Sequence, residues 1–162
     1  MRGLRSSVTV WCVITLRTLS VDDWPEWRAM RLAALAESPH AFGTRLADWQ
    51  GEGDVGERWR SRLADVDLNL LAAYRGTPAG IVSGKLHEQG VVQVLSLYVA
   101  PFARGRGVGD ELLRAVVHWA GRRQVLLRVF EGNHPARNLY RRNGFTPGER
   151  YGDEREMVYR AG

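Results

Sequence analysis

The hydrophobic positions along this 162-residue chain change period several times, and each change marks a boundary between predicted elements. Apolar residues recur every three to four positions in predicted helices, and form short β-rich runs in predicted strands. Capping residues and prolines mark the helix starts, and glycine-containing turns separate the strands. The predicted order is strand 12–19, helix 20–39, loop 38–56 with one helical turn around 45–50, helix 57–65, strands 68–76, 79–89 and 91–100, helix 107–123, strand 124–131, helix 133–145 and strand 154–160.

The three consecutive strands over 68–100 are joined by short turns, which predicts an antiparallel meander. The strand over 91–100, the helix after it and the strand over 124–131 form one strand–helix–strand crossover. Two strands joined in this way should lie parallel. The pattern therefore predicts an α+β fold whose mixed sheet is mostly antiparallel and contains one parallel pair.

The composition is that of one globular domain, with 44% hydrophobic and 25% charged residues. Cys12 is the only cysteine, which excludes an internal disulfide and a cysteine-based zinc site. We expect no metal site. No stretch approaches the roughly 20 apolar residues that a membrane span needs. A single cysteine also fits a reducing cytoplasm, where we expect the protein to act.

The N-terminus needs a separate interpretation, because Arg2 and Arg5 precede a short apolar run, as in a secretory signal. That run contains Thr9 and Thr15 and reaches Arg17 without a small-residue cleavage site. We therefore expect residues 1–11 to be a disordered lead and residues 12–162 to form a single domain.

Positive charge gathers around the sequence RGRGVG at 104–109. Lys85 is the only lysine, so the net charge of +5 comes almost wholly from arginine, and residues 104–150 hold ten arginines against four acids. Glycines expose backbone N–H groups, and a helix N-terminus carries partial positive charge, so this loop favours a phosphate. The alternative is that the glycines serve only for turning and close packing.

Two nucleotide-binding motifs fit this loop poorly. A P-loop needs a lysine after its glycines, and none is present. A dinucleotide fingerprint has the spacing G-x-G-x-x-G directly after a strand and an acid about 20 residues later. Glu131 could supply the acid, but the glycines here are spaced G-x-G-x-G and APFAR separates them from the strand.

Two stretches resemble motifs of the GNAT superfamily of acetyl-CoA-dependent N-acetyltransferases. LSLYVAPFARGRGVGDELL at 95–113 resembles the central [QR]-x-x-G-x-[GA] motif through Arg104, Gly107 and Gly109. NHPARNLYRRNGF at 133–145 resembles the downstream motif N-x-x-A-x-x-L-Y-x-x-x-G-F. The resemblance is specific over residues 91–147. It implies a GNAT-like fold of six to seven strands, with the parallel pair splayed apart and helices on both faces of the sheet.

The same resemblance implies that acetyl-CoA is the co-substrate. Its diphosphate would bind the backbone amides of the 104–109 loop, and its pantetheine arm would pair with the strand ending at Val99, where a backbone N–H would face the thioester carbonyl. Tyr140 occupies the family's tyrosine position, so it is our candidate catalytic acid; packing of its ring in the core is the alternative. The implied coenzyme-binding residues are Leu97, Val99, Arg104, Gly105, Arg106, Gly107, Val108, Gly109, Asp110, Asn133, Ala136 and Tyr140.

No general base can be identified from the sequence. Relatives often carry a glutamate early in the central strand, but Gln93 stands at the matching position, and a neutral amide cannot accept the proton. The remaining candidates are Glu88, His87, His40 and water held by Ser96. We expect His118 to be structural.

The implied function is N-acetyltransfer to a primary amine of a small molecule or a protein, by direct attack on the thioester. Gln93 leaves a non-catalytic acetyl-CoA-binding sensor as the alternative. A nucleic-acid-binding protein would also suit the arginine content, but no basic helix interleaved with aromatics is present, so we expect no nucleic acid and no membrane as partner. Dimers are common among relatives, which leaves a homodimer open.

Overall fold

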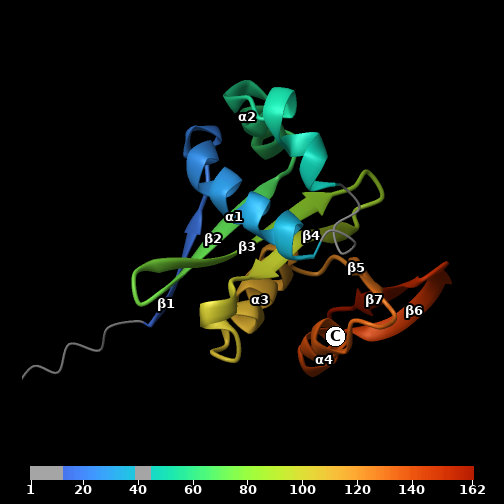
Figure 1. The fold of residues 1–162 in the computed structure, drawn as a ribbon. Coiled ribbons are helices and arrows are strands. Elements are labelled where there is room, and N and C mark those ends of the chain that lie inside the picture. The colour runs from blue at the N-terminus through green and yellow to red at the C-terminus, as the bar shows by residue number, and fades with distance from the viewer. Residues whose placement is uncertain (1–12, 39–44) are drawn as a thin grey trace, which may run out of the picture.

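The computed structural model describes residues 13–38 and 45–162, which form one seven-stranded sheet with helices on both faces (Figure 1). The four α-helices are α1 (Trp24–Glu37), α2 (Gly56–Ala64), α3 (Val108–Ala120) and α4 (His134–Arg142). The strands are β1 (Ile14–Thr18), β2 (Leu68–Tyr74), β3 (Thr77–Leu86), β4 (Val92–Val99), β5 (Val125–Phe130), β6 (Thr146–Tyr151) and β7 (Glu154–Tyr159).

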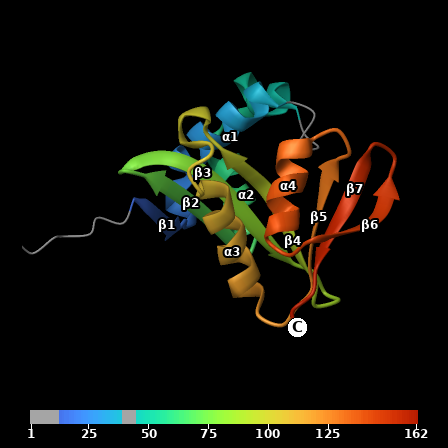
Figure 2. The ribbon, with the colours of Figure 1, turned by 90° about the horizontal axis from the view of Figure 1, so that it is seen from below.

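The strand order in the sheet is β1-β2-β3-β4-β5-β7-β6, and among these described strands β4 and β5 are the one parallel pair. This confirms the predicted meander over β2, β3 and β4 and the predicted crossover through α3. Helices α1 and α2 cover one face, and α3 and α4 cover the other (Figure 2). None of the helices in the described ranges is long and apolar enough to cross a bilayer.

Each face of the sheet has its own hydrophobic core. Trp27 of α1 and Trp59 of α2 are fully buried against Ile81 on one face. On the other face, α3 packs Leu112 and Val116 against Val82 and the neighbouring strands. Burying large apolar side chains on both faces accounts for the nearly continuous burial of β2 and β3.

The parallel pair opens shortly after it begins. Strands β4 and β5 pair only at Val92 with Val125 and at Gln93 with Leu126, although both strands continue for several residues. Further along β4, a bulge against β3 places Ser96 at φ +56°, a backbone conformation that non-glycine residues seldom adopt. The sheet is therefore split at its centre, as the resemblance implied.

Most predicted boundaries agree with the structure, with one strand missed. A 3₁₀ turn over Leu46–Trp49 lies where a turn was predicted, Pro25 lies in the first turn of α1, and Asn133 caps α4 by accepting from the amide of Ala136 at 3.3 Å. Strand β6 was missed because Pro147 and its exposed neighbours give no alternating pattern, although an edge strand tolerates proline. The prediction for residues 1–11 lies outside the described residues.

Candidate active site

A cleft of about 730 Å³ runs along the gap between β4 and β5 to the N-terminus of α3. Every predicted coenzyme-binding residue except Arg106 lines it. The predicted residues on its walls are Leu97, Val99, Arg104, Gly105, Gly107, Val108, Gly109, Asp110, Asn133, Ala136 and Tyr140. The fold thus brings the two sequence motifs together on opposite sides of one cavity.

The loop before α3 turns so that backbone amides face outward at the helix start. Gly107 is the N-cap at φ +89°, and Gly105 lies at φ +71°, conformations that cost an L-residue about 1–2 kcal/mol. The amide of Glu111 donates to Gly107 O at 3.0 Å, so the amides of the preceding turn have no acceptor inside the helix. Such a turn suits an anion.

Gly109 serves a different purpose from the other glycines of the loop. A Cβ at this position would lie 3.2 Å from Leu139 Cδ2 and 3.5 Å from Val99 Cγ2. The missing side chain therefore allows α3, α4 and the end of β4 to approach closely. The need for close packing, and not a left-handed backbone conformation, therefore explains why a glycine stands at position 109.

Asp110 would repel a phosphate at the helix start if its charge were not balanced. Arg142 of α4 donates to both oxygens of this carboxylate, at 2.8 and 2.9 Å, and Asn143 donates at 2.8 Å. The hydrogen bonds from Arg142, followed by that from Asn143, lower the pKa of Asp110 to about 2, against the opposing effect of burial. The pair neutralises the acid and ties α3 to α4.

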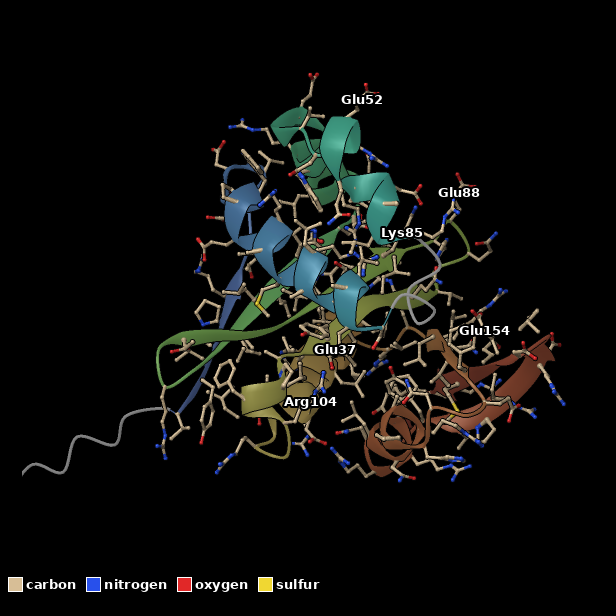
Figure 3. The ribbon with its side chains drawn as sticks, viewed as in Figure 1. Glu37, Glu52, Lys85, Glu88, Arg104 and Glu154 are labelled. Atoms are coloured by element: carbon tan, nitrogen blue, oxygen red, sulfur yellow. The ribbon has the colours of Figure 1, made fainter. Side chains whose placement is uncertain are left out.

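The two arginines of the loop point in different directions. Arg104 donates from Nε to the carbonyl oxygen of Val99 at 3.1 Å and forms an ion pair with Glu37 at the end of α1 (Figure 3). The guanidinium of Arg106 lies 5.9 Å from the ring centre of Tyr74, away from the cleft. Of these two loop arginines, only Arg104 lines the cavity.

The edge of β4 offers backbone groups to the cleft. The amide of Ala100 donates to Ala79 O on β3 at 2.8 Å, so by the alternation of a strand the amide of Val99 points away from β3. The contact of Arg104 with the Val99 carbonyl agrees with this direction. An extended chain could pair with this edge as an added strand.

Tyr140 projects from α4 into the wall of the cleft with 8% of its surface exposed. Burial raises the pKa of its hydroxyl to about 12, so the hydroxyl is protonated at neutral pH. The centre of its ring lies 6.1 Å from that of Phe145 in the core. The side chain therefore packs in the core and also lines the cleft. Its catalytic role stays a prediction.

Glu37 is a cleft residue that the sequence did not single out. Its carboxylate accepts from Tyr98 Oη at 2.8 Å and from Arg104. Burial alone would raise the pKa of Glu37, but the hydrogen bonds from Arg104 and Tyr98 outweigh it and hold this pKa below its usual value. A lone glutamate at the end of a helix has no sequence signature that indicates such a position.

Of the candidates for proton removal named from the sequence, only Ser96 is found on the wall of the cleft in the described residues. His87 Nε2 lies 2.8 Å from Gln93 Oε1, and neither residue lines the cleft. Glu88 is exposed in the turn before β4 (Figure 3), and His40 lies outside the described residues. Ser96 does line the cleft. His118 is exposed on α3 away from the cavity.

Comparison with known proteins gives consistent results. The mycothiol acetyltransferase of Corynebacterium glutamicum is 33% identical over 135 residues, which is 78% of this chain and 38% of that protein. The chain spans about two fifths of the length of the curated relatives that it matches. The activities of these longer relatives therefore cannot be assigned directly to this chain.

Solved structures share the fold. The PaiA N-acetyltransferase from Thermoplasma acidophilum, in complex with coenzyme A, has a TM-score of 0.75 at 19% identity, covering 93% of this chain and all of that one. The ribosomal L7/L12 alpha-N-protein acetyltransferase RimL, also with coenzyme A, has a TM-score of 0.73 at 17% identity, covering 93% and 96%. A family model described as the acetyltransferase (GNAT) family matches residues 19–145, and this chain belongs to that family.

Proposed function

We propose that this protein transfers an acetyl group from acetyl-CoA to a primary amine. The observation that carries the proposal is one continuous cleft, which joins the free amides at the start of α3 to the gap between β4 and β5. Family membership supports the same reaction, and coenzyme A in two neighbouring structures supports the same co-substrate.

The cleft fits a coenzyme A in charge and in shape. The amides of the turn from Gly107 to Asp110 suit a diphosphate, and the ion pair with Arg142 balances the negative charge of Asp110 at that turn. The outward edge at Leu97 and Val99 suits the amides of a pantetheine arm. Acetyl-CoA, when bound, supplies an acetyl thioester that a neutral amine can attack.

The residues of the gap would assist the transfer in three ways. A backbone amide at Leu97 or Val99 donates a hydrogen bond to the thioester carbonyl and stabilises the negative charge that develops there. The walls hold the amine beside the acyl carbon, where its lone pair forms the new C–N bond as the C–S bond breaks. Tyr140 gives its proton to the departing thiolate, and the nitrogen, which carries one proton too many after the C–N bond has formed, releases a proton that restores the Tyr140 hydroxyl.

The amine must lose a proton before it attacks. An amine with a pKa near 10.4 is mostly protonated at pH 7, which costs about 4–5 kcal/mol if nothing assists. Ser96 lines the cleft and can order a water that carries this proton to solvent. The proposal includes an acceptor amine on a small molecule or on a protein. It also includes assembly of the protein as a homodimer.

Two measurements on the intact chain test the function. Titration calorimetry should show binding of acetyl-CoA, and a thiol-release assay should show turnover with at least one member of an amine panel: a polyamine, an amino acid, an aminoglycoside and a peptide with a free N-terminus. Binding without turnover on any amine would favour the sensor alternative, which no finding supports at present. No binding of acetyl-CoA would overturn the proposal.

A further inference from the structure

A positively charged network surrounds Arg62 in the last turn of α2, on the face of the sheet that α1 and α2 cover. We call the part of the cleft on this face, next to Ser96, its acceptor side. Its guanidinium reaches across to the sheet, where Nη1 donates to Asn69 Oδ1 at 3.3 Å and Nη2 donates to Ser83 Oγ at 3.3 Å and Ser96 Oγ at 3.2 Å. It also lies 5.0 Å from the ring centre of the fully buried Trp27. The hydrogen-bond partners of Arg62 are thus polar but neutral.

The guanidinium of Arg62 contacts no carboxylate directly, although Asp65 at the end of α2 lies near enough to interact with its charge. Within the described ranges, Arg62 forms no ion pair at 4.0 Å or less. The acids of the α1 and α2 layer that do form ion pairs contact other arginines: Asp22 with Arg60, Asp23 and Glu26 with Arg17, Asp48 with Arg45, Asp54 with Arg28, and Glu37 with Arg104. Buried charges are normally paired, because desolvation is otherwise costly.

A second guanidinium increases the local positive charge. Arg31 of α1 is 7% exposed, and its pKa is lowered to about 10, first by burial and then by the charge of Arg62. Burial also lowers the pKa of Arg62 to about 10, although Asp65 partly opposes this. Both guanidinium groups stay charged at neutral pH, and an anion beside Arg62 would restore solvation that its guanidinium loses on burial.

Ser96 connects this charge to the cleft. The residue lines the cavity, holds a left-handed backbone conformation at the bulge of β4, and precedes Leu97, which also lines the cavity. Its hydroxyl accepts from Arg62 and so can still donate to a ligand in the cleft. A ligand anion at Ser96 would lie next to the amide that meets the thioester carbonyl in the proposed reaction.

We propose that the acceptor is a small amine that also carries a carboxylate, as an amino acid does, and that Arg62 and Ser96 bind this carboxylate. This proposal rests on the proposed acetyl transfer. In an α-amino acid a single carbon separates the two groups, so the amine would reach the acyl carbon while the carboxylate stays at Ser96. A singly charged carboxylate matches one guanidinium fork and one hydroxyl. The three hydrogen bonds of Arg62 are long, at 3.2–3.3 Å, and therefore weak. A carboxylate could accept more strongly from the same guanidinium.

The wild-type protein alone provides the first test. Thiol release from acetyl-CoA is measured with amino acids, with their carboxamides and with the corresponding decarboxylated amines. We expect kcat/KM to be about tenfold to a hundredfold higher for the acids, the range of one charge-assisted hydrogen bond. Equal or higher values for the amides and the plain amines would overturn the carboxylate site while leaving acetyl transfer intact.

Variants then assign the site to Arg62. Arg62→Met keeps an apolar stem and should abolish the preference for acids over amides, mainly through a higher KM for the acids. Arg62→Lys should keep part of the preference. Arg60→Met on the same helix is the matched control, since Arg60 is exposed and pairs with Asp22. An Arg62→Met protein that loses activity equally on acids and amides would show an anchoring role only.

A binding measurement separates this proposal from the proposed function. If acetyl-CoA binds but no amine releases thiol, the function fails, and the site is tested by calorimetry with an amino acid and its carboxamide in the presence of coenzyme A. Tighter binding of the acid that is lost in Arg62→Met supports the site. Equal binding of the two compounds overturns it.

Discussion

Arg104 and Val99 are joined by a hydrogen bond of 3.1 Å from the guanidinium Nε to the backbone carbonyl, at the point where β4 ends and the cleft begins. The same guanidinium pairs with Glu37, so α1, the end of β4 and the loop before α3 meet at one side chain. Arg106, two residues later in the same motif, takes no part in this arrangement.

This difference predicts unequal effects of two similar substitutions. Arg104→Met should weaken acetyl-CoA binding about tenfold, because it removes a cationic side chain that lines the cleft next to the proposed phosphate site. Arg106→Met should change binding less than twofold. Calorimetry at low ionic strength measures both dissociation constants. A larger loss in Arg106→Met would show that the cofactor approaches from the Tyr74 side instead.

Two substitutions of Gly107 separate the effect of backbone strain on stability from the effect of charge on coenzyme binding. Gly107→Ala should destabilise the protein by about 1 kcal/mol, because the residue lies at φ +89° although a Cβ would meet only Ile14 Cδ1, at 3.8 Å. Gly107→Glu should cost a similar amount of stability and in addition weaken acetyl-CoA binding more than tenfold. Urea unfolding and calorimetry measure the two effects. Unchanged affinity in a folded Gly107→Glu protein would contradict the phosphate cradle.

Tyr140→Phe tests the candidate acid. We expect kcat to fall at least tenfold while the acetyl-CoA dissociation constant changes less than threefold, because the ring stays packed in the wall and only the proton donor is lost. The pKa of about 12 predicts that the wild-type hydroxyl remains protonated up to about pH 11, so ionisation of Tyr140 should not limit turnover below that pH. Equal turnover in the variant would remove Tyr140 from the mechanism.

The Asp110–Arg142 ion pair predicts a pH dependence of stability. The folded pKa of Asp110, about 2, lies below the unfolded value of 3.8, so its stabilisation is present above pH 4 and is lost as the pH falls towards 2. The shift corresponds to about 2 kcal/mol, and we expect about half of it because Arg142 is mostly exposed. Asp110→Asn should therefore be less stable than wild type at pH 7 by about 1 kcal/mol in urea unfolding. Near pH 2 the two proteins should converge, whereas a constant difference would point to a cause other than ionisation.

The chemical motifs were readable from the sequence because their residues serve local backbone needs. Gly107 must adopt positive φ, and Asn133 must cap a helix, wherever the rest of the chain lies. Both requirements depend on neighbours within a few residues. The two motifs therefore predicted which residues would line the cleft, with Arg106 as the exception, since the direction of its side chain depends on packing against β2.

The amino-acid order by itself determined the succession of helices and strands, the parallel crossover and the phosphate-favouring loop, because hydrophobic period and backbone preference act over short distances. Only the tertiary structure decided that Glu37 would meet Arg104 and Tyr98, and that Arg62 would reach Ser96, because these pairs are 67, 61 and 34 residues apart in the chain. Such contacts depend on how two helices pack across a sheet. No local pattern encodes that packing, and it is what shapes the acceptor side of the cleft.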